Sequence, residues 1–171
     1  FLSISQGAAI FADTVANTIC KLSNKYKIKV YQQSRQEDIN KIKELYSKCN
    51  IEYYVEPFFN NINELYTIAD LVISRSGASS IFEIIGFKKP SILIPYSKSI
   101  NGDQIANATY LNQKEAAIVF SDISITIDIL YNKIDYLINN KYELDILSYN
   151  LSSINLANST TNLLDNVIKN I

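Results

Sequence analysis

The feature that most constrains the fold of this chain is a repeated alternation between two apolar patterns. Short apolar runs, which predict strands, alternate with longer segments in which apolar residues recur every three to four positions, as on one face of a helix. The predicted strands are Phe1–Ile4, Lys27–Gln33, Ile51–Val55, Leu71–Ser74, Ser91–Ile94 and Ala117–Phe120. The predicted helices are Ala8–Leu22, Gln36–Cys49, Asn61–Ala69, Ser80–Phe87, Asp103–Gln113, Ile125–Asn139 and two further segments up to Ile171.

Strands that alternate with helices form βαβ units, in which the strands are parallel and helices cover both faces of the sheet. We therefore predict the α/β class, with a doubly wound, six-stranded, mostly parallel sheet and additional C-terminal helices. The chain contains no low-complexity tract and no internal linker, so residues 1–171 are expected to form one domain.

The first predicted strand is unusually short. Only four residues precede the turn at Ser5-Gln6-Gly7, whereas strands commonly contain about five or six residues. The chain also begins with Phe1 and contains no methionine. We expect it to be part of a longer protein.

The composition excludes several classes of function. Hydrophobic residues make up 47% of the chain and charged residues 19%, as in a soluble globular domain. A net charge of −1 provides no broad basic field for nucleic acid. Cys20 and Cys49 form no CxxC or zinc-binding spacing, so we expect two reduced cysteines on apolar helix faces.

Three loops are expected to meet at the carboxyl ends of the strands, where open parallel sheets bind their ligands. They are Ser5–Ala8, Arg75–Ser80 and Pro95–Gln104. In the first two, a strand is followed by serine, glycine, a small residue and then a helix. A helix N-terminus offers unpaired N–H groups and a positive dipole end, which suit a phosphate. The alternative is that these loops are ordinary turns with serine caps.

Individual side chains in these loops have two interpretations each. Ser80 and Glu83 fit the S-x-x-E capping box, but Glu83 could instead accept hydrogen bonds from both hydroxyls of a ribose. Arg75 could bind phosphate or form a structural ion pair with Asp70 or another carboxylate. Gln104 could contact a sugar hydroxyl or simply occupy the first turn of a helix.

The pair Phe58-Phe59 follows Pro57 at the end of a predicted strand. It could form a wall of a pocket for a base, through ring and backbone, or it could close the end of the sheet by packing.

Several chemistries lack the residues they need. The chain has no histidine, which excludes Ser-His-Asp and Cys-His nucleophiles. It contains no DxD, HExxH, P-loop or GxGxxG motif. We therefore predict no metal ion and no cofactor.

Taken together, the motifs resemble those of the MurG family, which are GT-B glycosyltransferases that add GlcNAc to the lipid-linked MurNAc-pentapeptide of peptidoglycan. The resemblance covers the whole chain and only the C-terminal, donor-binding domain of that family. The motifs that carry it are Ser5-Gln6-Gly7-Ala8, Phe58-Phe59-Asn60-Asn61, the stretch Ala69–Ala78, Glu83, Pro95, Asp103-Gln104 and Asn107-Ala108.

The resemblance implies a binding site for UDP-GlcNAc, whose expected residues are Ser5, Gln6, Gly7, Phe59, Arg75, Ala78, Ser79, Ser80, Ile81, Phe82, Glu83 and Gln104. It implies that the Ser5 turn and the helix N-terminus at residues 78–82 approach the diphosphate. The Phe59 backbone would contact the uracil, Glu83 the ribose and Gln104 the GlcNAc.

The chain departs from the family pattern at three positions, where Ser3 and Ile4 replace two glycines and Asp103 replaces a histidine. The resemblance implies that the acceptor domain and the catalytic base lie outside these residues, so the isolated chain is expected not to transfer GlcNAc. It also implies peripheral contact with the cytoplasmic side of the bacterial inner membrane, mainly through the other domain. The alternatives are another GT-B-like UDP-sugar enzyme, such as an epimerase or a glycolipid synthase, and a non-catalytic nucleotide-binding domain.

Overall fold

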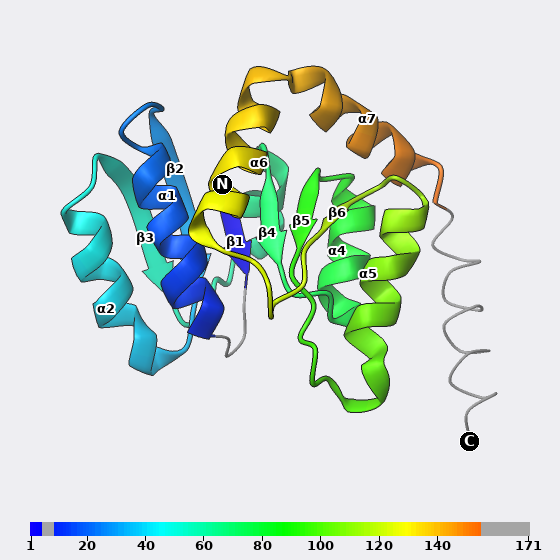
Figure 1. Ribbon diagram of the computed structural model, residues 1–171, viewed down its shortest axis with the longest axis horizontal. Helices are drawn as coiled ribbons and strands as arrows, with labels where there is room; N and C mark the ends of the chain where they lie inside the picture. Colours follow the sequence, from blue (N-terminus) through cyan, green and yellow to red (C-terminus); the bar gives the residue numbers. More distant parts are fainter. Residues whose placement is uncertain (5–8, 155–171) are drawn as a thin grey trace.

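The computed structural model describes residues 1–4 and 9–154, and its centre is a single six-stranded sheet (Figure 1). The strands are β1 (Leu2–Ile4), β2 (Ile28–Gln33), β3 (Ile51–Glu56), β4 (Val72–Ser74), β5 (Ser91–Leu93) and β6 (Ile118–Val119). Each predicted strand is present. Every strand pair is parallel, so the predicted fold class is confirmed.

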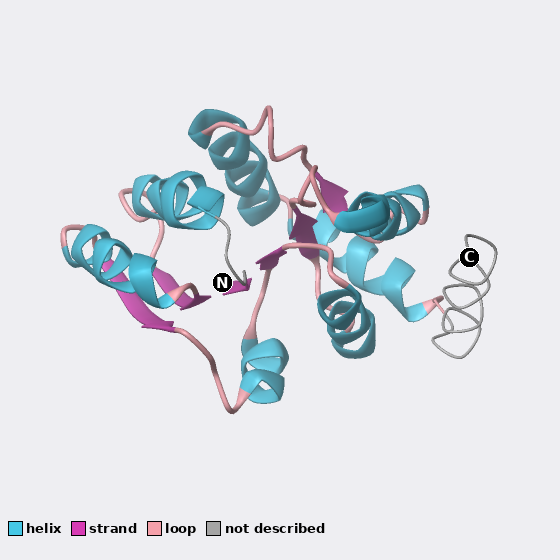
Figure 2. Cartoon of the chain, turned by 90° about the horizontal axis from the view of Figure 1, so that it is seen from below, coloured by secondary structure: helices cyan, strands magenta, loops and turns pink. Residues whose placement is uncertain are grey.

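Helices cover both faces of the sheet (Figure 2). A π-helical turn at Phe11–Val15 leads into the first of them. The α-helices are α1 (Ala16–Leu22), α2 (Gln36–Ser47), α3 (Ile62–Ile68), α4 (Ala78–Phe87), α5 (Asp103–Gln113), α6 (Ile127–Asn139) and α7 (Lys141–Ser152). The last predicted helical segment lies beyond the described residues.

The strand order is β3-β2-β1-β4-β5-β6. From β1 the chain first adds strands on one side of the sheet and then, starting with β4, on the other side. The chain builds the first half outward from β1 to β3 and then returns through α3 to place β4 on the other side of β1. The ends of these strands lie in register, with Ile4 beside Ser74 and Ser74 beside Leu93. The loops that follow β1, β4 and β5 therefore start at the same edge of the sheet, at the place where such folds bind ligands.

Two apolar cores, one on each face, hold the helices to the sheet. Adjacent strand residues point to opposite faces, so Val72 and Ile73 of β4 belong to different cores. The core that contains Ile73 packs against α1, α2 and α6, and its members include Phe11, Ile19, Ile42 and Ile134. The core that contains Val72 packs against α3, α4, α5 and α7, and its members include Leu65, Tyr66, Ile84, Leu111 and Leu151.

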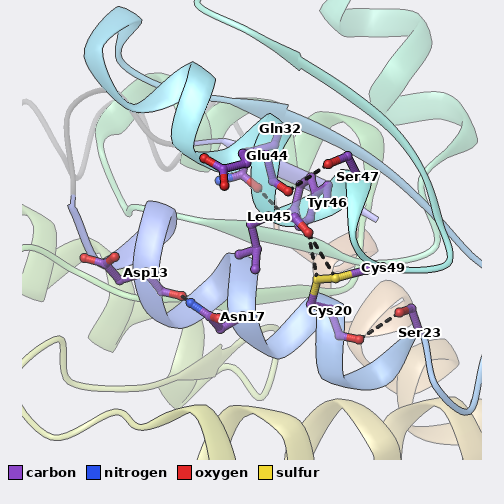
Figure 3. The surroundings of a disulfide bond; sticks show 10 residues. All are labelled: Asp13, Asn17, Cys20, Ser23, Gln32, Glu44, Leu45, Tyr46, Ser47 and Cys49. Atoms are coloured by element: carbon purple, nitrogen blue, oxygen red, sulfur yellow. Dashed lines mark hydrogen bonds between the residues drawn. A yellow bond between two sulfur atoms is a disulfide. The ribbon is translucent and has the colours of Figure 1, made fainter.

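The expectation of two reduced cysteines is wrong for this structure. Cys20 near the end of α1 and Cys49 just after α2 are joined in a disulfide, with 5.6 Å between their Cα atoms (Figure 3). Both sulfur atoms lie near the Leu45 carbonyl oxygen, at 3.6 Å for Cys20 and 3.2 Å for Cys49. The spacing in sequence gave no sign of this pair, because its members meet only when α1 and α2 pack side by side.

Within residues 1–4 and 9–154, none of the helices has both the length and the apolar character that crossing a bilayer requires.

Candidate functional site

The N-terminus of α4 lies at the carboxyl edge of the sheet, directly after β4. Gly77 is the N-cap residue, with an extended backbone, and within the described chain no side chain caps this end. The N–H group of Ile81 donates to the Gly77 carbonyl at 3.0 Å, which is the first bond of the helix. The N–H groups of Ala78, Ser79 and Ser80 precede that bond and have no acceptor within the helix. They provide the positive end of the helix dipole at the strand-order reversal.

The helix boundary decides between the two interpretations of Glu83. A capping box requires Ser80 at the N-cap, but Ser80 is the third residue of α4 and Gly77 is the N-cap. The capping alternative is therefore wrong. Glu83 is half-buried and lies about one turn beyond the unpaired N–H groups. This position suits a group that binds the part of a ligand next to a diphosphate.

Arg75 belongs to a buried ion pair. Its Nη1 donates to the Ile94 carbonyl at 2.7 Å and to Asp122 Oδ2 at 3.1 Å. The two charged side chains are only 13% and 10% exposed. The backbone N–H of Ser97 donates to the same carboxylate oxygen at 3.2 Å. This ion pair, with Asp122 rather than Asp70, ties together the loops that follow β4, β5 and β6.

Burial lowers the pKa of Arg75, and its pairing with Asp122 opposes that shift. The guanidinium nevertheless stays charged at physiological pH. Burial by itself would raise the pKa of Asp122, but the Ser97 N–H and the Arg75 guanidinium hold it below its ordinary value. Both members of the pair are thus ionised at neutral pH.

The N-terminus of α5 is bonded to the loop after β4. The Ser76 hydroxyl donates to the Gln104 carbonyl at 2.7 Å, and the Asn107 side-chain amide donates to the Ser76 carbonyl at 3.0 Å. The Gln104 side-chain oxygen accepts from the Tyr96 N–H at 3.0 Å. Gln104 is thereby held at the same edge of the sheet as the N-terminus of α4.

The two phenylalanines after β3 lie in different environments. The Phe59 side chain is 8% exposed and meets the Tyr31 ring edge to face, with 6.2 Å between the ring centroids. Phe58 is 61% exposed. The packing interpretation therefore describes the Phe59 ring, while a contact between its backbone and uracil stays a prediction.

The remaining predicted residues are placed as follows. Ser5, Gln6 and Gly7 lie outside the described residues. In the first two turns of α4, Ala78 and Ser79 are exposed, Ser80 and Phe82 are half-buried, and Ile81 belongs to the core.

Neither Asp122 nor Ser76 was predicted from the sequence as a partner in this network. The position of Asp122 directly after the last predicted strand could have indicated its role, because the loop after that strand starts at the same edge of the sheet as the loop that carries Arg75. The described residues contain no group of three or more His, Cys, Asp or Glu side chains that could hold a metal ion.

A family model for the glycosyltransferase family 28 C-terminal domain matches residues 3–165. The chain belongs to this family. This family 28 domain is 40% identical over 150 residues to a protein of Rickettsia felis, covering 86% of the chain and 42% of the relative. It is 36% identical over 159 residues to a protein of Wolbachia sp. subsp. Drosophila simulans, covering 92% of the chain and 46% of that relative. The chain thus spans less than half the length of these curated relatives.

Both relatives carry the name UDP-N-acetylglucosamine--N-acetylmuramyl-(pentapeptide) pyrophosphoryl-undecaprenol N-acetylglucosamine transferase. Among solved structures, the family 28 domain resembles MurG of Acinetobacter baumannii, with a TM-score of 0.82 and 23% identity over 98% of the chain and 49% of that structure. It also resembles a Staphylococcus aureus MnaA-UDP structure, with a TM-score of 0.63 and 13% identity over 86% of the chain and 39% of that structure. These likenesses support the Rossmann-like GT-B fold, and the predicted resemblance to the MurG family is confirmed.

Proposed function

We propose that this domain is the donor-binding half of an inverting transferase that moves GlcNAc from UDP-GlcNAc to a lipid-linked MurNAc-pentapeptide. The observation that carries this proposal is the N-terminus of α4, where unpaired N–H groups and Glu83 lie at the strand-order reversal. The names of the family 28 relatives supply the sugar and the acceptor.

We assign roles to the predicted residues as follows. The N–H groups of Ala78, Ser79 and Ser80 bind the diphosphate, together with Ser5, Gln6 and Gly7. Glu83 binds the ribose hydroxyls. The Phe59 backbone binds the uracil, and Gln104 binds the GlcNAc. Arg75 supports the diphosphate site through its ion pair with Asp122 rather than by direct contact.

The chemistry follows from these placements. As the bond between the sugar and UDP breaks, negative charge develops on the departing diphosphate. The N–H groups at the N-terminus of α4 are already oriented to stabilise that charge, so no reorganisation is needed as the bond breaks. Inversion also requires a base that removes the proton from the acceptor hydroxyl, and we assign that base to a second domain.

We also propose a setting for the whole protein. Residues 1–171 form the donor domain of a two-domain enzyme that works at the cytoplasmic side of the bacterial inner membrane. The lipid-linked acceptor and most of the membrane contact belong to the other domain.

Titration calorimetry with UDP-GlcNAc, UDP-Gal, UDP-Glc and UDP tests this proposal. We expect binding of UDP and a preference for UDP-GlcNAc over the other two sugar nucleotides. A preference for another sugar would favour a different UDP-sugar enzyme. Absence of UDP binding would show that the donor assignment is wrong.

A further inference from the structure

The interface between α3 and α4 contains a buried hydroxyl group without a hydrogen-bond partner. Tyr66 of α3 is 0% exposed, and within the described part of the chain its hydroxyl oxygen makes no hydrogen bond. Buried polar groups in native proteins are nearly always hydrogen-bonded, so an exception calls for an explanation. A phenylalanine would fill the same space without burying an unsatisfied polar atom.

The ring of Tyr66 lies against the part of α4 that carries Glu83. It stacks on the Phe87 ring, with 5.3 Å between the centroids and 6° between the planes. Glu83 and Phe87 are four residues apart and therefore share one face of α4. Glu83 is one turn closer to the helix N-terminus, where the diphosphate is proposed to bind.

The charge of Glu83 acts on the Tyr66 hydroxyl. Burial raises the pKa of Tyr66, and the Glu83 carboxylate raises it further. The hydroxyl therefore keeps its proton at physiological pH and can donate one hydrogen bond. An ionised carboxylate only accepts hydrogen bonds, and its two oxygens accept several.

We propose that Tyr66 is a positioning residue that donates a hydrogen bond to the Glu83 carboxylate when a nucleoside diphosphate binds. That bond occupies one acceptor site on the carboxylate and directs the others toward the two ribose hydroxyls. A glutamate side chain held in this way loses less rotational freedom on binding, which strengthens the contact. This inference rests on the proposed function, because it assumes that Glu83 binds the ribose.

Calorimetry with UDP and 2′-deoxy-UDP tests the inference, because the second ligand lacks one hydroxyl of the diol. We expect the wild-type domain to bind UDP about tenfold more tightly than 2′-deoxy-UDP. In Tyr66→Phe the preference should fall to roughly threefold or less, mainly through weaker UDP binding. In Glu83→Gln it should also fall, and adding Tyr66→Phe to that variant should change nothing further.

Tyr46→Phe is the matched control. Tyr46 is also fully buried, but it lies in the core on the other face of the sheet, and its hydroxyl donates to the side-chain oxygen of Gln32. Thermal melts should show that all variants fold, and Tyr46→Phe should keep the wild-type preference for UDP.

The outcomes separate this inference from the proposed function. If Tyr66→Phe keeps the full preference while Glu83→Gln loses it, Tyr66 does not position Glu83 and the donor site stands. If the wild type binds UDP and 2′-deoxy-UDP equally, both the ribose assignment and the role of Tyr66 are wrong. If the wild type does not bind UDP, the proposed function itself fails.

Discussion

At the scale of single residues, Glu83 is the side chain on which the proposed donor site most depends. Its helix begins at Ala78 with Gly77 as the N-cap, so Glu83 does not cap the helix. The half-buried side chain of Glu83 lies about one turn beyond three N–H groups that have no acceptor within the helix. Because the Glu83 carboxylate does not cap its own helix, it is available to bind a ligand.

We expect Glu83→Ala to weaken UDP binding far more than it weakens the fold. Loss of a charge-assisted contact costs about 1.5–3 kcal/mol, which corresponds to a ten- to hundredfold loss of affinity. The free energy of unfolding should change by less than about 0.5 kcal/mol, since no cap is lost. Calorimetry with UDP, alongside urea denaturation, measures both quantities.

Glu44→Ala provides a comparison for this variant. Glu44 lies on α2 and is 71% exposed, with Lys48 as its partner. This substitution should leave UDP affinity unchanged. Equal UDP affinity in the wild type and Glu83→Ala would contradict the ribose assignment.

At the scale of elements, two contacts connect segments that are distant in sequence. The ion pair of Arg75 and Asp122 joins the loops after β4 and β6, and the bond from the Ser97 N–H adds the loop after β5. The disulfide between Cys20 and Cys49 joins α1 to the end of α2. Both contacts add a polar or covalent link between segments that also pack through apolar side chains.

The Arg75–Asp122 pair predicts a specific dependence of stability on pH. The pKa of Asp122 is lower in the folded state than its ordinary value, so the pair stabilises the fold fully above about pH 4. That stabilisation is lost as the pH falls through the folded-state pKa. Asp122→Asn should lower the free energy of unfolding by roughly 3 kcal/mol at pH 7. The difference from wild type should shrink below about pH 4.

Urea denaturation at a series of pH values between 7 and 3 measures this difference. Asp128→Asn is the control, because Asp128 is 78% exposed in its pair with Lys21 and such surface pairs contribute little. A constant difference between Asp122→Asn and wild type at every pH would show that the pair is not the source of the effect.

The disulfide predicts an effect of reducing agent on stability. It closes a loop between residues that are 29 positions apart, and disulfides that close such loops stabilise a fold by about 2–4 kcal/mol. Addition of a reductant should lower the free energy of unfolding of the wild type by this amount. The same treatment should have no effect on the variant with both Cys20→Ala and Cys49→Ala.

Alkylation with iodoacetamide in denaturant, followed by mass spectrometry, gives the state of the two cysteines directly. Labelling of both in protein that was never reduced would show that the bond is absent in solution.

At the scale of the whole molecule, we expect the positive potential of the proposed diphosphate site to come from backbone dipoles. The net charge is −1, and the chain has neither histidine nor a DxD motif. We expect UDP to bind without any divalent ion, because the N–H groups at the N-terminus of α4 should supply the charge complementarity that a metal supplies in other transferases.

Calorimetric titration of UDP with EDTA, and then with added Mg²⁺ or Mn²⁺, tests this expectation. The dissociation constants should agree within about twofold, or 0.4 kcal/mol. A strong increase of affinity with either ion would contradict the metal-independent donor site.

The sequence by itself determined the type and order of the elements in this protein. Apolar periodicity is a property of neighbouring residues, so it identified all six strands and, from their alternation with helices, the α/β class. Small and polar residues directly after strands likewise located the loop before α4. The start of α4 was less well determined, because Ser80 fits a capping motif, whereas Gly77 is the N-cap in the structure.

Only the tertiary structure decided which distant side chains meet. Arg75 pairs with a carboxylate 47 residues away, the two cysteines are 29 residues apart, and Tyr66 stacks on a ring of the next helix. These contacts depend on the strand order and on the register of each strand, which in turn depend on how both apolar cores pack. A local sequence pattern contains no information on strand order or register. Several carboxylates therefore remained candidate partners for Arg75 until the structure placed the loops after β4, β5 and β6 at one edge of the sheet.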